Sequence, residues 1–157
     1  KIMNKKEEKS MSIDHRRNDL KELGAEKTDA QVTLQELKEE VLAFTVERDW
    51  LQFHTPKNIA TALSCEAAEL LEFFLWTKDS ESQRHLEKHR EEIMHEVADV
   101  FTYVLSFCVE NNIDLASAFA KKMELNRKKY PVERAKGSSA KYTAYHQDEK
   151  KETKKEV

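Results

Sequence analysis

The sequence is poor in the residues that make tight turns and cross-links. Its 157 residues include only 2 Gly, 2 Pro and 2 Cys, whereas 36% of them are charged. So little glycine and proline leaves few of the turns that a sheet needs, and it favours long helices with polar outer faces. We therefore predict an all-α protein with one domain, because this length suits a single helical core.

Several partners and locations are disfavoured by what is missing. No apolar run approaches the roughly 18 residues of a membrane-spanning helix, and the polar start lacks the apolar core of a signal peptide. The net charge of −3 gives no overall basic field, so we expect neither a membrane nor a polynucleotide partner. Cys65 and Cys108 lie in apolar helical patterns, which fits buried, reduced thiols and a cytoplasmic location.

Apolar residues recur with helical spacing in four segments, each with start or stop signals. The predicted helices cover residues 34–53, 56–76, 82–109 and 115–130. We predict that they form a four-helix bundle within residues 31–131, between a flexible N-terminal arm of residues 1–30 and a polar C-terminal tail of residues 132–157. The second helix carries more apolar surface than four helices can cover, so we expect a homo-oligomer.

Two pairs of acids interrupt the apolar stripes of the second and third helices. Glu66 and Glu69 form one pair, and Glu96 and Asp99 form the other. Spacing i, i+3 puts both members of a pair on one side of a helix, so two packed helices could bring four carboxylates together. Such a cluster needs cations to offset its charge. Oxygen ligands without His or Cys favour Mg²⁺, with Mn²⁺ as the alternative.

Other candidate residues are ambiguous from spacing alone. The aromatic residues Trp50, Trp76 and Tyr103 could stack on a nucleobase or fill the core. His54 could donate to a ligand or cap a turn. The fourth helix carries cationic and amide donors on one side, which could hold phosphate or could simply be exposed; these are Lys122, Asn126 and Tyr130. We interpret the pair His85 and His89 as part of a solvated face.

The order and spacing of these residues resemble the MazG-like all-α nucleotide pyrophosphohydrolases. The two acid pairs stand in the order E-x-x-E, 26 intervening residues, E-x-x-D. Further motifs resemble the dCTP pyrophosphatase branch: Glu47-Arg48-Asp49-Trp50, Gln52-Phe53-His54-x-Pro56-x-Asn58, Phe74-x-Trp76 and Asn126-Arg127-Lys128-Lys129-Tyr130-Pro131. The similarity covers roughly residues 34 to 143. One position departs from it: a His often precedes the tryptophan by nine residues in that branch, and here the residue is Val41.

The resemblance implies an enzyme that converts a dNTP, dCTP first, and water to dNMP and pyrophosphate. It implies that Glu66, Glu69, Glu96 and Asp99 hold Mg²⁺, with Glu69 as the catalytic residue that orients or deprotonates the attacking water. The remaining implied roles are a base and sugar pocket formed by Trp50, His54, Asn58, Trp76 and Tyr103, and a phosphate-side group formed by Lys122, Asn126 and Tyr130. It also implies a homo-oligomer built as a dimer of dimers.

Three alternatives remain at this stage. One is the same reaction with a broad or non-cytosine dNTP preference, because Val41 replaces a His. Another is a catalytically silent nucleotide-binding module. The last is a structural helical assembly in which the acids are polar groups of a helix seam.

Overall fold

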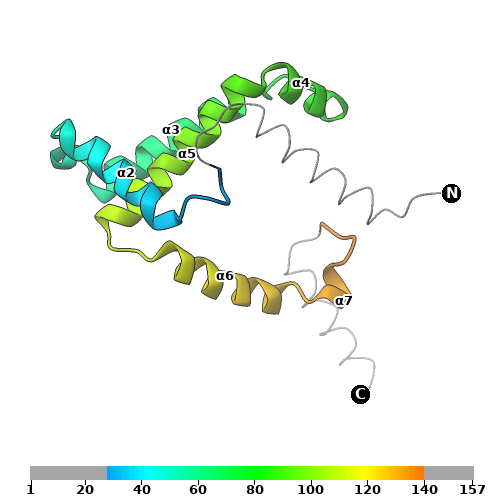
Figure 1. Ribbon diagram of the computed structural model, residues 1–157. Helices are drawn as coiled ribbons and strands as arrows, with labels where there is room; N and C mark the ends of the chain where they lie inside the picture. Colours follow the sequence, from blue (N-terminus) through cyan, green and yellow to red (C-terminus); the bar gives the residue numbers. More distant parts are fainter. Residues whose placement is uncertain (1–27, 140–157) are drawn as a thin grey trace. The chain divides into compact units, whose positions relative to one another are not determined.

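The computed structural model describes residues 28–139, and these contain helices and turns but no strand (Figure 1). The predicted all-α class is therefore confirmed. The longer helices are α2 (Leu34–Glu47), α3 (Pro56–Glu72), α5 (Arg90–Glu110) and α6 (Leu115–Lys129), and the shorter ones are η1 (Leu51–Phe53), η2 (Asp79–Glu81), α4 (Ser82–Lys88) and α7 (Val132–Ala135). Within the described residues, no helix combines the length and apolar character needed to cross a membrane.

The chain divides into two compact units, one ending at Glu110 and the other beginning at Asn111. In the first unit, α5 packs along α3 and also contacts α2, and Figure 1 shows α3 and α5 side by side. The apolar side chains that are buried in the described part of the chain all come from α3 and α5: Ile59, Ile93, Leu105 and Cys108. The α3–α5 pair is therefore the frame on which the acidic residues are placed.

Helix α2 is shorter than the predicted segment 34–53. It begins with a reciprocal capping box in which the Thr33 hydroxyl accepts from the Glu36 backbone N–H and the Glu36 carboxylate accepts from the Thr33 N–H. It ends at Glu47 because Asp49 takes a left-handed conformation, with φ of 54°. Residues 51–53 then form the separate helix η1.

Helix α3 begins as the sequence predicts and ends four residues earlier than expected. The Thr55 hydroxyl accepts from the Asn58 backbone N–H, and Pro56 occupies the first turn. At the other end, Phe74 N–H donates to Leu71 C=O and Thr77 N–H donates to Phe74 C=O. These tight i to i+3 bonds replace helical ones, so Trp76 lies in a turn after the helix.

The predicted third helix is divided at His89, between α4 and α5. The backbone of His89 leaves helical geometry there, with φ of −114° and ψ of 33°. The rings of His85 and His89 lie 4.6 Å apart, and they contact Phe74 and Phe73 respectively at the end of α3. The interpretation of this pair as a solvated face was therefore wrong, because aromatic packing partly covers both rings.

The second unit contains α6 and α7. The Asp114 carboxylate caps α6 by accepting from the Ser117 backbone N–H, and the helix ends at Lys129, one residue before the predicted end at Tyr130. The left-handed Asn112 lies between α5 and this cap. The predicted tail begins with the short helix α7, whereas the remainder of the tail beyond residue 139 and arm residues 1–27 lie outside the described residues.

Candidate metal and nucleotide site

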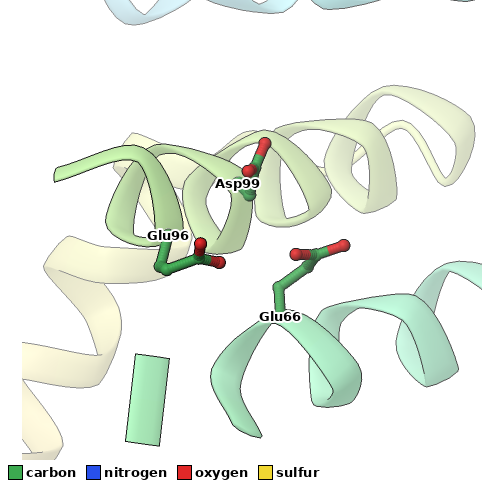
Figure 2. Close-up of side chains that lie close together, drawn as sticks. All are labelled: Glu66, Glu96 and Asp99. Atoms are coloured by element: carbon green, nitrogen blue, oxygen red, sulfur yellow. The ribbon is translucent and has the colours of Figure 1, made fainter. Parts of the chain in front are cut away.

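Three of the four predicted acids converge between α3 and α5. Glu66 on α3 and Glu96 and Asp99 on α5 each offer a carboxylate oxygen, and these oxygens all lie within 4.8 Å of one another (Figure 2). Glu66 and Glu96 are half-buried, whereas Asp99 is exposed. The helical i, i+3 spacing places the two α5 acids on one side, and the packing of α3 on α5 brings Glu66 to face them. We call these three residues the carboxylate cluster.

Among the described residues, no cationic side chain forms an ion pair with the carboxylate cluster. Within residues 28–139, none of the three side chains makes a hydrogen bond or an ion pair. Burial raises the pKa of Glu66, and the charges of Glu69, Asp99 and Glu96 raise this pKa further. Mutually repelling oxygen ligands without a cationic neighbour fit a hard divalent ion such as Mg²⁺ or Mn²⁺.

Glu69 occupies a different place from the other acids. It lies one turn along α3 from Glu66 and is exposed, and its carboxylate does not belong to the cluster. It is nevertheless close enough for its charge to raise the pKa of Glu66. Its catalytic and metal-binding roles stay predictions.

A pocket of about 590 Å³ adjoins the carboxylate cluster. It is lined by side chains from α2, the α2–α3 connection, α3 and α5: Leu37, Glu40, Val41, Phe44, Thr45, Trp50, His54, Glu66, Ala98, Asp99, Phe101, Thr102, Tyr103, Leu105 and Ser106. Two predicted metal ligands therefore share one pocket with three predicted nucleotide contacts. An acidic site beside an aromatic and apolar cavity is a geometry that suits a nucleotide, which has a charged end and a flat end.

Trp50 reaches this pocket because of the way α2 ends. Its N–H donates to the Thr45 carbonyl, and the Asp49 N–H donates to the Val46 carbonyl, at 3.0 Å in each case. These two bonds around a left-handed residue form a Schellman motif, which commonly brings the residue after the turn against the last helical turn. Here the Trp50 ring meets the Phe44 ring edge-on, with 5.9 Å between centroids.

Phe44 is a pocket residue that sequence reasoning missed, since it was assigned to the apolar stripe of its helix. Apolar periodicity does not indicate this role, because the role depends on the left-handed Asp49 that ends the helix. Once the helix is known to stop there, the usual apolar contact across a Schellman motif pairs Phe44 with Trp50. Phe101 was missed as well, because nothing in its helical spacing separates pocket from core.

The segment between Trp50 and α3 is held by short-range hydrogen bonds. The His54 N–H donates to the Leu51 carbonyl, and the Asn58 side-chain amide donates to the Phe53 carbonyl at 2.9 Å. Asn58 is exposed and does not line the pocket, and its hydrogen bond links α3 to η1. His54 does line the pocket and is half-buried.

Tyr103 lies on α5 and lines the pocket together with Glu66 and Asp99. Burial raises the pKa of its phenol, and the nearby charges of Glu66 and Asp99 raise it further. Tyr103 is therefore held in its neutral form, in which the hydroxyl can donate a hydrogen bond.

Two hydroxyls at the pocket are already engaged with their own helices. Thr45 donates to the Val41 carbonyl and Ser106 donates to the Thr102 carbonyl, both at 2.9 Å. Both side chains are buried. Since these protons are used within α2 and α5, this part of the pocket contacts a ligand mainly by shape and apolar surface.

Four further predicted substrate contacts are not among the residues that line this pocket. Trp76 is 92% exposed and does not line the pocket. Lys122 and Asn126 lie one turn apart on α6 in the second unit, and Tyr130 is the residue that directly follows this helix. Their participation in a phosphate site stays a prediction. Cys65, which was expected to be buried, is exposed, whereas Cys108 is buried as expected.

Comparison with known proteins decides the family. A model of the MazG-like family matches residues 61–144, which is more than half of the chain and includes all four acids. This chain belongs to the MazG-like family. A solved structure agrees with this assignment. The MazG-like chain is 42% identical to a pyrophosphatase from Archaeoglobus fulgidus whose crystal structure is known. The structural match has a TM-score of 0.61 and covers 62% of this chain and 92% of the archaeal one.

The MazG-like chain is also similar to mammalian proteins named dCTP pyrophosphatase 1. It is 39% identical over 113 residues to the protein of Rattus norvegicus and 38% identical over 113 residues to that of Homo sapiens. Each alignment covers 71% of this chain and 66% of the mammalian protein. The matched part thus spans just under two thirds of the length of these relatives.

Proposed function

We propose that this protein is a nucleoside triphosphate pyrophosphohydrolase, which converts a dNTP and water to dNMP and pyrophosphate. The observation that carries the proposal is the shared pocket, in which Glu66 and Asp99 of the carboxylate cluster lie with Trp50, His54 and Tyr103. Family membership and the names of the mammalian and archaeal relatives support the same reaction class. The cellular role would be sanitation of the nucleotide pool in the cytoplasm.

The chain offers a division of labour for this reaction. Glu66, Glu96 and Asp99, with Glu69 beside them, would hold Mg²⁺, which supplies charge neutralisation of the phosphates and a more acidic bound water. Glu69 orients or deprotonates the attacking water, because it is exposed and outside the cluster.

Recognition of the nucleotide falls to other residues of the chain. Trp50 offers a flat face for the base, and His54 and Tyr103 offer polar groups in the same pocket. Lys122, Asn126 and Tyr130 would bind phosphate oxygens, since they combine a cation with amide and hydroxyl donors along α6 and at its end.

The leading substrate in this proposal is dCTP, with a broader or non-cytosine preference as the second candidate. One observation favours the second candidate: Val41, at the position where the dCTP pyrophosphatase branch often has a His, lines the pocket. An apolar side chain there removes a hydrogen-bonding partner from the pocket wall. Base preference is thus the part of the proposal that depends most on this chain's own residues.

We also propose that the protein is a homo-oligomer, assembled as a dimer of dimers. Met94, Val97 and Phe101 follow one another at helical spacing on α5, and each is at least 40% exposed in the single chain. An uncovered apolar stripe of this kind favours burial against another subunit. Light scattering of V97E beside the unchanged protein tests it, and an unchanged molecular mass in V97E would reject this face.

The reaction is tested by incubating the protein with each dNTP separately, with and without Mg²⁺, and separating the products by ion-exchange chromatography. Monophosphate and pyrophosphate formed only with Mg²⁺, and fastest from dCTP, are the expected result. Equal turnover of all four dNTPs would keep the reaction and reject the cytosine preference. Tight binding without any product would instead support a catalytically silent nucleotide-binding module.

A further inference from the structure

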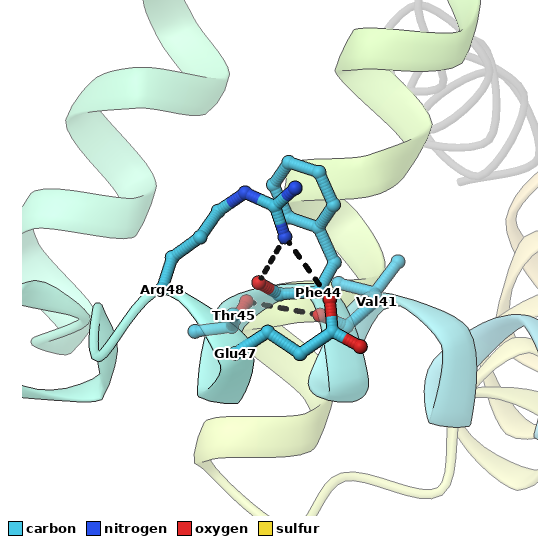
Figure 3. A network of polar contacts seen from close by, with 5 residues as sticks. All are labelled: Val41, Phe44, Thr45, Glu47 and Arg48. Carbon is cyan, nitrogen blue, oxygen red and sulfur yellow. Dashed lines mark hydrogen bonds and ion pairs between the residues drawn. The ribbon is translucent and has the colours of Figure 1, made fainter.

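A cationic side chain that does not line the pocket contacts one of the aromatic residues that do. Arg48 follows the last residue of α2, and its guanidinium carbon lies 3.5 Å from the centroid of the Phe44 ring. One guanidinium nitrogen, Nη1, also donates to the Phe44 carbonyl oxygen at 2.9 Å (Figure 3). Phe44 lines the pocket, whereas Arg48 does not. The same side chain thus contacts both the ring and the backbone of one pocket residue.

These two contacts are mutually consistent and suit arginine. The planar guanidinium can lie flat on the ring as a cation–π partner while its edge donates to a carbonyl at the negative end of the helix. The ion pair with Glu47 is a lesser contact, since its 3.3 Å separation joins side chains that are 40% and 71% exposed. Phe44 is therefore the residue that Arg48 chiefly contacts.

Fixing Phe44 also fixes its neighbour on the other side. The Trp50 ring meets Phe44 edge-on at an interplanar angle of 75°, and both rings are nearly half exposed, at 49% and 45%. Rings with so little cover would lose rotamer freedom when a flat ligand packs on them. A guanidinium that already restrains the first ring lowers this cost, so a ligand meets a pre-organised wall.

We propose that Arg48 is a positioning residue for nucleobase binding: it holds the Phe44–Trp50 wall in place and takes no part in phosphate chemistry. This inference rests on the proposed function for its substrate, a dNTP. Arg48 acts on the side of the nucleobase, whereas the carboxylate cluster acts on the side of the phosphates. Substitution of Arg48 should therefore change KM for a complete nucleotide and leave kcat and metal binding unaltered.

The experiment compares R48M, which keeps the aliphatic stem, and R48K, which keeps the charge, with the unchanged protein. R84A is the matched control, because Arg84 is exposed and its side chain pairs with Glu81 at 3.3 Å, outside the pocket. We expect KM for dCTP to rise about threefold to thirtyfold in R48M, and less in R48K, as expected for loss of a cation–π contact and of some pre-organisation. The value of kcat and the Mg²⁺-induced rise in Tm should stay unchanged, and R84A should match the unchanged protein throughout.

A substrate without a base makes the test specific. Deoxyribose 5′-triphosphate carries the sugar and phosphates only, so its kcat/KM should be equal in R48M and in the unchanged protein. A fall for this substrate as large as the fall for dCTP would overturn the inference, as would an unchanged KM for dCTP. Tm measured without nucleotide shows whether R48M is folded. If R48M does not fold, the same comparison of KM values is made with R48K.

The inference can fail separately from the proposed reaction. Binding of dCMP, followed by quenching of tryptophan fluorescence, needs no turnover. If the unchanged protein hydrolyses no dNTP but R48M still weakens dCMP binding, the reaction is rejected and the role of Arg48 stands. If dCMP binds equally to both proteins, the role of Arg48 is rejected whatever the reaction.

Discussion

The two ends of the pocket are built by different physical means. At the acidic end, Glu66 and Asp99 line the pocket from the interiors of regular helices, and they lie together with Glu96 despite mutual repulsion. At the aromatic end, Phe44 and Trp50 lie around the end of α2, where a left-handed residue and local hydrogen bonds hold them. The acidic end is electrostatically unfavourable without a cation, whereas the aromatic end is stabilised by hydrogen bonds within the chain.

This difference teaches that catalysis and recognition can be altered separately. A change at the acidic end acts on charge, so it should appear in turnover and in the response to metal. A change at the aromatic end acts on surface and pre-organisation, so it should appear in KM. Each of the following predictions tests that separation.

The largest effect is expected from D99N. The substitution keeps the size of the side chain and removes one negative charge from the carboxylate cluster, so the site holds a cation less well. We expect kcat to fall by about 100-fold or more, as for other losses of electrostatic stabilisation at an active site. Binding of dCMP should remain. The matched control is E91Q, an exposed acid of the first turn of α5 outside the cluster; equal activity of D99N and the unchanged protein would contradict the assignment.

A smaller effect, on KM and not on kcat, is expected from W50A. Stacking of a base on an aromatic ring contributes about 1–3 kcal/mol, so KM for dCTP should rise about tenfold to hundredfold. The Mg²⁺-induced rise in Tm should be the same as in the unchanged protein. Loss of that rise in W50A would show that the two ends are coupled, and the separation would then be wrong.

The positive φ of Asp49 offers a test of how the aromatic end is built. A β-branched residue is strained at φ of 54°, so D49V should destabilise the fold by about 1–2 kcal/mol and also raise KM, because Trp50 loses its anchoring turn. D49G is the matched variant: it also loses the bond between the Asp49 carboxylate and Gln52, but it accepts the left-handed conformation. Thermal melting and KM should separate the two, and equal behaviour would exclude backbone strain as the cause.

The smallest effect concerns pH and stability in the absence of metal. Since the folded protein raises the pKa of Glu66 above 4.5, it binds this proton more tightly than the unfolded chain does. Stability in EDTA should therefore decline as pH rises through the window from 4.5 to the raised pKa. E66Q should flatten this decline and also lose the Mg²⁺-induced rise in Tm. Thermal melting of both proteins at several pH values measures this decline. A steeper decline in E66Q than in the unchanged protein would contradict the predicted direction of the pH dependence.

The sequence was most informative where structure is regular. Helical spacing placed Glu96 and Asp99 on one side of α5, and the apolar stripes indicated that Glu66 would face them. The helix starts at Thr33, Thr55 and Asp114 were predictable as well, because each cap is a local hydrogen bond between residues three apart.

The irregular features could not be predicted in the same way. A left-handed Asp49 and the break at His89 depend on local backbone geometry that apolar periodicity does not encode. The roles of Phe44 and Phe101 depend on which elements face the pocket, which is a tertiary property. The residues of the carboxylate cluster could thus be predicted from their spacing in the sequence, whereas the residues of the pocket wall could be identified only from the structure.

The short range of the bonds around Trp50 has a consequence for how the protein folds. The backbone hydrogen bonds that fix residues 49–54 join partners no more than five positions apart. Such contacts close small loops and lose little chain entropy, so this turn can form while the rest of the chain is still open. Glu66 and Glu96, about thirty positions apart, meet only when α3 and α5 pair. The Phe44–Trp50 wall can thus assemble early, whereas the carboxylate cluster is completed late.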